Sequence, residues 1–221
     1  MLLFPRGHQR LASLRTLACG LLLGGLALVP LQRLFADSRP PAADSPASSD
    51  AAVLGQSLPL TGPSAQLGLD YQRGAMAWFE EVNRRGGIHG RPIRLVSLDD
   101  QYEPSKTLEN TRQLLQRQDL LALFGYVGTP TTKVALPLIE QASVPLVAPM
   151  TGASLLRRPE LTMVFNLRSS YRLEIEAMVD ELVRDANHRI AVVYQDDAFG
   201  QDGLKAAIEA LARHDLTPVA T

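Results

Sequence analysis

The stretch FGYVGTPTTKVALPLIEQASVPLVAPMTGA, from Phe124 to Ala153, holds two short loops that are separated by a helix-like segment. The loops, 125–129 and 149–152, are rich in Gly, Thr and Pro, and each follows a short apolar run that is typical of a buried strand. A strand, a helix and a second strand in this order predict two parallel strands joined by a helical crossover. Both loops then lie at the carboxyl ends of strands, where open parallel sheets bind ligands.

The same alternation continues on both sides of this stretch and predicts an α/β fold with mainly parallel sheets. Two further loops, 169–171 and 194–203, also follow strand-like segments, so we expect four loops to converge on one site. The expected strands are 53–60, 92–98, 120–124, 145–148, 163–167, 189–194 and a last one from residue 216, and the expected helices are 70–85, 103–118, 131–141, 173–186 and 203–213.

Length and composition are those of an ordinary globular protein. The chain has 221 residues, of which 46% are hydrophobic and 20% charged, enough for one large domain or two small ones. The net charge of −1 and the lack of a basic patch argue against a nucleic-acid partner. Cys19 is the single cysteine, so the chain cannot form an internal disulfide.

The first 36 residues have the pattern of a secretory signal. Three arginines precede the 15-residue apolar run 17–31, and the run is followed by LFA, which ends at Ala36. The run is short for a membrane span, although an uncleaved anchor formed by residues 17–31 is the alternative. Residues 37–50, DSRPPAADSPASSD, predict a disordered linker. Removing residues 1–36 removes four arginines and no acids, which leaves 18 basic against 23 acidic residues, a net charge of −5.

Thr129 and Pro130 favour a helix start, with Thr129 as the capping residue and Pro130 as the first helical position. The start of a helix presents free N–H groups and a partial positive charge, which suit a carboxylate. The alternative is an ordinary helix cap without a ligand. The second loop favours the ligand, because it offers Thr151 and the N–H of Gly152 beside the first loop.

Enzyme signatures are largely missing, and we expect a protein that is not an enzyme and holds neither cofactor nor metal. The sequence has no dinucleotide fingerprint, no Walker A loop and no nucleophile elbow. Its four histidines are scattered. The acidic pairs 99–100 and 196–197 follow strands, where carboxylates more often serve as caps than as catalysts. A hydrolase that uses Asp196 and Asp197 is therefore a weaker hypothesis.

The segment LGQSLPLTGPSAQLGLDYQRGAMAWFEEVNRRGGIHGRPIRLVSLDDQYEPSKT, from Leu54 to Thr107, resembles the start of the periplasmic solute-binding proteins of branched-chain amino acid ABC transporters. The opening stretch and RIAVVYQDDAFGQDGL, 189–204, resemble the next sections of this family. The resemblance covers residue 53 to the end. It implies a type I periplasmic-binding fold, in which two Rossmann-like α/β lobes with mainly parallel sheets close over a ligand.

The resemblance also implies which residues hold the ligand. Thr129 falls at the helix start that binds the ligand's carboxylate, and the loop after the next strand adds Met150, Thr151 and Gly152. Tyr171 falls near the ligand's amine, and Phe199 where the second lobe carries an aromatic ring. The ligand-binding residues expected from the resemblance are thus Thr129, Met150, Thr151, Gly152, Tyr171, Phe199 and Leu67.

Several positions depart from the family pattern. Leu67 stands where relatives often place an aromatic residue, Tyr171 where several carry an acid, and Phe199 lacks a tyrosine's hydroxyl. Some amino-acid binders join the loops at Tyr102 and Gly128 by a disulfide, and here we expect the ring to pack on the glycine. Branched-chain amino acids are thus one candidate among amino acids, amides, urea-like compounds and aromatic acids.

The resemblance implies an extracytoplasmic, periplasmic receptor that delivers a small amino acid or amide-like ligand to an ABC permease in the inner membrane. A ligand-sensing domain of a signal-transduction protein is the alternative. We expect an N-terminal lobe at 51–167, a hinge crossing at 168–172 and the start of a second lobe at 173–221. Because the sequence stops within an expected strand, we expect both lobes to be incomplete and the C-terminal part of the fold to be missing.

Overall fold

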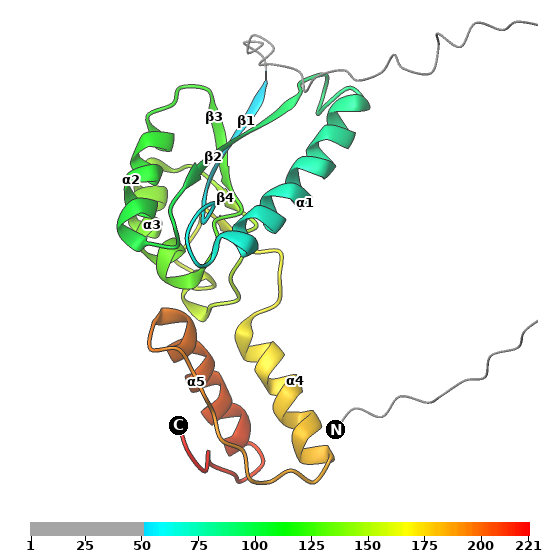
Figure 1. Ribbon diagram of the computed structural model, residues 1–221, viewed down its shortest axis with the longest axis vertical. Helices are drawn as coiled ribbons and strands as arrows, with labels where there is room; N and C mark the ends of the chain where they lie inside the picture. Colours follow the sequence, from blue (N-terminus) through cyan, green and yellow to red (C-terminus); the bar gives the residue numbers. More distant parts are fainter. Residues whose placement is uncertain (1–50) are drawn as a thin grey trace, which may run out of the picture. The chain divides into compact units, whose positions relative to one another are not determined.

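The computed structural model describes residues 51–221, and the expected signal or anchor (1–36) and linker (37–50) lie outside them. Within this range, five strands form one sheet in the order β2-β1-β3-β4-β5, and every neighbouring pair is parallel (Figure 1). The α/β fold with a mainly parallel sheet is therefore confirmed. The strands are β1 (Ala52–Leu58), β2 (Ile93–Asp99), β3 (Leu120–Phe124), β4 (Leu146–Val147) and β5 (Val164–Phe165).

The strand register aligns the carboxyl ends of the strands. Leu58, the last residue of β1, pairs with Asp99, the last residue of β2. Phe124 at the end of β3 pairs with Val147 at the end of β4. Because the ends within each pair are level, the loops after β1 and β2 begin side by side, and so do the loops after β3 and β4.

Helices flank the sheet on both faces. Figure 1 shows α1 (Ala65–Arg84) on one side of the strands, and α2 (Pro104–Leu115) and α3 (Thr129–Ala142) on the other. The remaining helices are the 3-10 turn η2 (Ser154–Leu156), α4 (Tyr171–Arg184) and α5 (Ala198–Ala212). Among the helices of residues 51–221, none combines the length and hydropathy that a membrane span requires.

The main core lies between the sheet and the helices α2 and α3, and aromatic contacts fix α1 on the opposite face. Phe124 stacks on Tyr71, with ring centroids 6.2 Å apart, and meets Phe79 edge-on at 5.3 Å. Trp78 follows Tyr71 by seven residues, close to two helical turns, so periodicity places it on the same helical face, but it is 62% exposed. The fully or nearly fully buried core residues are Leu114, Leu123, Tyr126, Ala135, Ile139 and Leu146.

The start of α3 differs from the prediction by one residue. Gly128 is the capping residue, Thr129 is the first residue of the helix, and Pro130 is the second. Gly128 has a φ of +99°, a conformation that glycine adopts without steric cost, and its carbonyl accepts the N–H of Thr132 at 3.2 Å. The glycine therefore turns the chain into the helix, and the hydroxyl of Thr129 is not used for capping.

Residues 189–194 and the segment from 216 do not form regular strands, contrary to the prediction. The two segments do run alongside each other, because the N–H of Val192 donates to the carbonyl of Ala220 at 3.0 Å and the N–H of Val219 donates to that of Ile190 at 2.9 Å. A strand needs a continuous ladder of such bonds, and these two are too few. The side chain of Val193 is accordingly exposed.

Helices α4 and α5 lie side by side and are joined by both apolar and charged contacts (Figure 1). Val179 packs with Ala210 and Leu211, all of them buried. Arg213 lies 2.6 Å from Glu176, and His214 Nε2 lies 2.7 Å from Asp180 Oδ1. This pairing fixes the position of Tyr171, at the start of α4, relative to Phe199, in the first turn of α5.

Candidate functional site

The loop after β3 and the loop after β4 lie against each other, as the sequence predicts. The N–H of Met150 donates to the carbonyl of Tyr126 at 2.7 Å, and the N–H of Gly128 donates to the carbonyl of Met150 at 3.4 Å. Val127 and Met150 form an isolated parallel bridge. The parallel pairing of β3 and β4 therefore continues past the strand ends and brings the start of α3 beside the second loop.

Thr129 and Thr151 meet at this point, with their Oγ1 atoms 2.7 Å apart. Both residues are fully buried, and Thr151 Oγ1 also accepts the N–H of Ala153 at 3.2 Å. The pair has two hydroxyl protons and uses one of them between the two oxygens. One proton is left for a third acceptor, so the pair can donate one hydrogen bond to a ligand oxygen.

Gly152 connects this pair to α4. The N–H of Tyr171 donates to the carbonyl of Gly152 at 2.8 Å. A Cβ on Gly152 would lie 2.6 Å from Cδ1 of Tyr171, a separation that real Cβ atoms do not show, so only glycine lets the ring lie against this loop. The ring of Tyr171 also meets Phe199 edge-on, with centroids 5.2 Å apart and planes at 78°.

Arg168 lies on the same ring, and its sequence position gave no sign of this role. The guanidinium carbon of Arg168 is 5.1 Å from the centroid of Tyr171, within the range of a cation–π contact. The same guanidinium donates to both carboxylate oxygens of Glu174, at 2.6 and 2.7 Å. This acid neutralises the arginine and holds it over the tyrosine ring.

Six of the seven predicted site residues are thus linked by contacts. Five of them form a continuous line from Thr129 through Thr151, Gly152 and Tyr171 to Phe199, and Met150 joins the line through its backbone. Leu67 lies in the first turn of α1 with 45% of its surface exposed, and no polar or aromatic contact joins it to the line among residues 51–221.

Tyr102 belongs to the same group, although the sequence suggested only that its ring packs on Gly128. This packing is confirmed, because a Cβ on Gly128 would lie 2.5 Å from Cε2 of Tyr102. Tyr71 supports the loops from the α1 side, where its hydroxyl donates to the carbonyl of Ala148 at 2.9 Å. The sequence feature that could have identified Tyr102 is its position in a loop at the carboxyl end of an expected strand, directly after two acids and a glutamine.

The first acidic pair of the sequence, Asp99 and Asp100, accepts hydrogen bonds at the ends of β1 and β2. Asp99 Oδ1 accepts the N–H groups of Leu60 at 2.7 Å and Gln101 at 3.0 Å, and its Oδ2 accepts the hydroxyl of Thr61 at 2.5 Å. Asp100 accepts the hydroxyl of Ser57 at 2.8 Å. The pair thereby ties the loop after β1 to the loop after β2.

The second acidic pair, proposed above for a hydrolase, has a similar role. Asp197 is the capping residue of α5 and accepts the N–H groups of Phe199 at 2.9 Å and Gly200 at 3.0 Å. Asp196 accepts the side-chain amide of Gln201 at 3.0 Å. Within residues 51–221, no group of three or more His, Cys, Asp and Glu side chains could hold a metal ion.

The pKa values of the two acids in the first pair are shifted in opposite directions. Burial acts to raise the pKa of Asp99, but the hydrogen bonds from Thr61, Leu60 and Gln101 outweigh it and leave the pKa lowered. Burial raises the pKa of Asp100, and its hydrogen bonds from Tyr102, Ser57 and Thr107 offset only part of this effect.

We expect Asp99→Asn to lower the melting temperature by a few degrees at pH 7 and to have less effect toward pH 3. A carboxylate with a lowered folded-state pKa stabilises the fold above its ordinary pKa of about 4, and this stability is lost as the pH falls through the folded-state value. Thermal melts between pH 3 and pH 7 measure the difference. Asp100→Asn is the control. Because the pKa of Asp100 is raised, the wild-type side chain stabilises the fold more as the pH falls. The melting temperature of Asp100→Asn should therefore fall further below that of the wild type toward pH 3.

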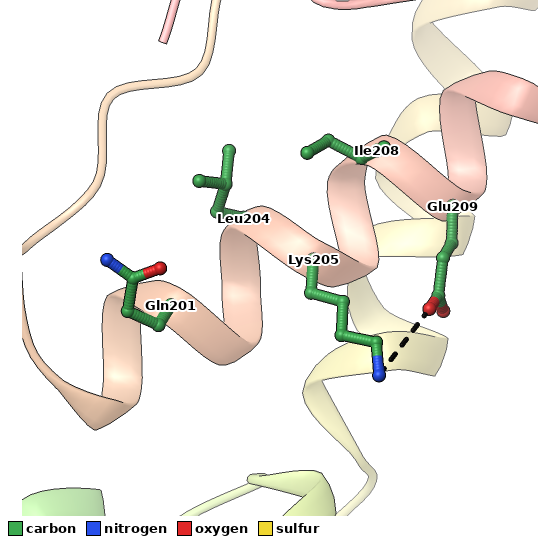
Figure 2. A pocket seen from close by; sticks show the side chains of 5 residues that line it. All are labelled: Gln201, Leu204, Lys205, Ile208 and Glu209. Atoms are coloured by element: carbon green, nitrogen blue, oxygen red, sulfur yellow. Dashed lines mark ion pairs between the residues drawn. The ribbon is translucent and has the colours of Figure 1, made fainter.

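Two hollows open on the part of the chain that contains α5. One of about 330 Å³ lies along the surface of α5 alone, between Gln201 and Glu209, where Lys205 Nζ is 3.9 Å from Glu209 Oε1 (Figure 2). None of the predicted site residues lines it. The other, of about 640 Å³, is lined by α4, α5 and residues 190–195, and its lining includes Tyr171 and Phe199. The second hollow therefore adjoins the candidate site.

Comparison with known proteins gives consistent matches. Residues 53–221 match the model of a family described as periplasmic binding protein. The chain is 31% identical over 164 residues to Leu/Ile/Val-binding protein homolog 3 of Brucella melitensis biotype 1, and this match covers 71% of this chain and 43% of that protein. It is also 31% identical over 160 residues to the chemotactic signal transduction system substrate-binding protein BasB of Halobacterium salinarum. This match covers 67% of this chain and 38% of that protein.

A solved structure gives the same result. The possible leucine/isoleucine/valine-binding protein from Rhodopirellula baltica SH 1 has a TM-score of 0.72 and is 36% identical, over 79% of this chain and 48% of that chain. The chain thus spans about half the length of the proteins that it matches, or somewhat less.

Proposed function

Because the chain belongs to the periplasmic binding protein family, we propose that it captures a small carboxylate-bearing solute, an amino acid or a related compound, and delivers it to an ABC importer of the inner membrane. The predicted family and type I periplasmic-binding fold are confirmed, and the chain is of the Leu/Ile/Val-binding type. This family binds solutes and is not a family of enzymes. A periplasmic location follows from the family.

The observation that carries the proposal is the line of contacts from Thr129 to Phe199. It joins the start of α3 and the loop after β4 to the first turns of α4 and α5. The N–H groups of Thr129 and Thr131 have no partner within the helix, since the first N–H groups of any helix lack one, and Pro130 has none. These donors and the free hydroxyl proton of the threonine pair suit a carboxylate.

The other end of this line of contacts, at the first turns of α4 and α5, suits the body of the ligand. Tyr171 and Phe199 offer aromatic surface, and the guanidinium of Arg168 covers one face of Tyr171. Since Thr129 and Thr151 have no exposed surface, the side chains over them must move before a ligand can enter. Ligand binding is therefore expected to be coupled to movement between an N-terminal lobe at 51–167 and a second lobe that begins at residue 173, about a hinge at 168–172.

A sensor of a signalling system is the second candidate, and the similarity to the chemotaxis protein of H. salinarum favours it. The two functions differ in the effect of removing the protein from cells. Loss of solute uptake supports the importer, whereas intact uptake with a lost behavioural response to the same solute supports the sensor. Cells that lack the gene, assayed for both responses, distinguish them.

The direct test is a thermal-shift screen of the purified chain against amino acids, their amides, ureas and small aromatic acids. A ligand that binds only the folded state, at 100 times its Kd, adds about 2.7 kcal/mol of stability. In a protein of this size such a gain raises the melting temperature by roughly 5–10 °C. A shift with one chemical class supports solute binding and defines the ligand, and a flat response to all classes contradicts the proposal.

A further inference from the structure

Tyr102 lies in a turn whose backbone is held in a conformation that costs energy. Gln101 and Tyr102 have φ values of +54° and +63°, in the left-handed region that non-glycine residues seldom adopt. The two preceding aspartates hold this turn, because Asp99 accepts the N–H of Gln101 at 3.0 Å and Asp100 accepts that of Tyr102 at 2.9 Å. The direction of the tyrosine ring is therefore fixed by the end of β2.

This turn places the ring over the start of α3. A Cβ on Gly128 would lie 2.5 Å from Cε2 and 2.8 Å from Cζ of Tyr102, so the ring lies directly on the residue that caps α3. Cζ is the atom that carries the hydroxyl. The phenol is therefore brought next to the helix start at which the carboxylate is proposed to bind.

The hydroxyl of Tyr102 is a hydrogen-bonding group without a partner in the part of the chain that the structure describes. The residue is half-buried, and no side chain or backbone atom among residues 51–221 makes a hydrogen bond with its hydroxyl. Burial raises the pKa of Tyr102, and the negative charges of Asp197 and Asp100 raise it further. The phenol is thus protonated at neutral pH and can donate a hydrogen bond.

We propose that Tyr102 is a ligand-binding residue, whose hydroxyl donates a hydrogen bond to the carboxylate of the solute at the start of α3. This inference rests on the proposed function. It assigns Tyr102 the role of selecting acids over neutral compounds of the same shape, because a hydrogen bond to a charged acceptor is worth more than one to a neutral acceptor.

The test compares Tyr102→Phe with the wild type by calorimetric titration with four carboxylates: L-leucine, L-phenylalanine, benzoate and phenylacetate. The variant keeps the ring on Gly128 and removes only the hydroxyl, so its melting temperature should stay within about 1 °C of the wild type, as for a change that breaks no protein hydrogen bond. The Kd of every carboxylate that binds should rise about tenfold or more, the usual effect of losing a donor to a charged group. Thr162→Val is the control, because it removes an exposed hydroxyl that precedes β5, at the amino end of that strand and away from the loops of the candidate site, and it should leave the Kd unchanged.

Each outcome decides the matter. If the wild type binds one of the four compounds and Tyr102→Phe weakens it tenfold, the assignment is supported. If binding is present and the variant changes the Kd less than twofold, the role of Tyr102 is wrong while solute binding stands. If the wild type binds none of the four, this inference and the proposed binding of such carboxylates both fail.

Discussion

Gly68→Ala is expected to lower the free energy of unfolding by about 3 kcal/mol, near the upper end of the cost of overpacking. Gly68 is the only buried residue of α1. A Cβ at this position would lie 1.8 Å from the carbonyl oxygen of Pro59 and 2.7 Å from its carbonyl carbon. Both are backbone atoms, so the helix itself must move away from the end of β1. Denaturant unfolding measures the loss, and the melting temperature should fall by roughly 6–12 °C.

Gly74 in the same helix provides a matched control with the opposite sign. A Cβ on Gly74 meets no atom within 4 Å. Gly74→Ala therefore adds helix propensity without a clash and should raise the free energy of unfolding by about 0.5–1 kcal/mol. If the two variants have equal stability, the close packing of α1 on the loop after β1 is wrong.

Elements that depend on local sequence were predicted well. β3 runs from Leu120 to Phe124, as expected, because a short apolar run between Asp119 and Gly125 has the length of a strand and is too short for a helix. Residues 189–194 are the opposite case. Their apolar pattern favours a strand, but a strand requires a neighbouring backbone, and residues 219 and 220 provide only two hydrogen bonds. Trp78 shows the same limit, because periodicity does not reveal how far a sheet extends under a helix.

The candidate site was predictable where it follows from parallel topology. Strand order alone brings the loop after β3 beside the loop after β4, and Thr129 therefore reaches Thr151. Tyr102 could be found only in part. Its packing on Gly128 was expected, but the two successive left-handed residues that direct the ring there, Gln101 and Tyr102, have no signal in the sequence because neither is a glycine. Arg168 was missed for a similar reason, because its place over Tyr171 depends on the ion pair with Glu174.

Thr129→Val is expected to weaken binding of the best carboxylate among L-leucine, L-phenylalanine, benzoate and phenylacetate by about 10- to 100-fold. Valine has nearly the shape of threonine but lacks the hydroxyl, so the buried volume is kept while one donor is lost at the helix start. A hydrogen bond to a charged group contributes about 1.5–3 kcal/mol, which corresponds to this range of affinity. The change also leaves the hydroxyl of Thr151 without its partner 2.7 Å away. Calorimetric titration gives the Kd, and thermal melts of the free variant give its stability.

Two further variants separate a role in binding from a role in folding. Thr129→Ser keeps the hydroxyl and should retain most of the affinity. Thr111→Val makes the same chemical change in the core of α2, where the hydroxyl donates to the carbonyl of Thr107 at 2.7 Å and lies 3.1 Å from that of Tyr126. It should lower the melting temperature and leave the Kd unchanged. If Thr129→Val behaves like Thr111→Val, Thr129 only supports the helix start, and the carboxylate must be held by other groups.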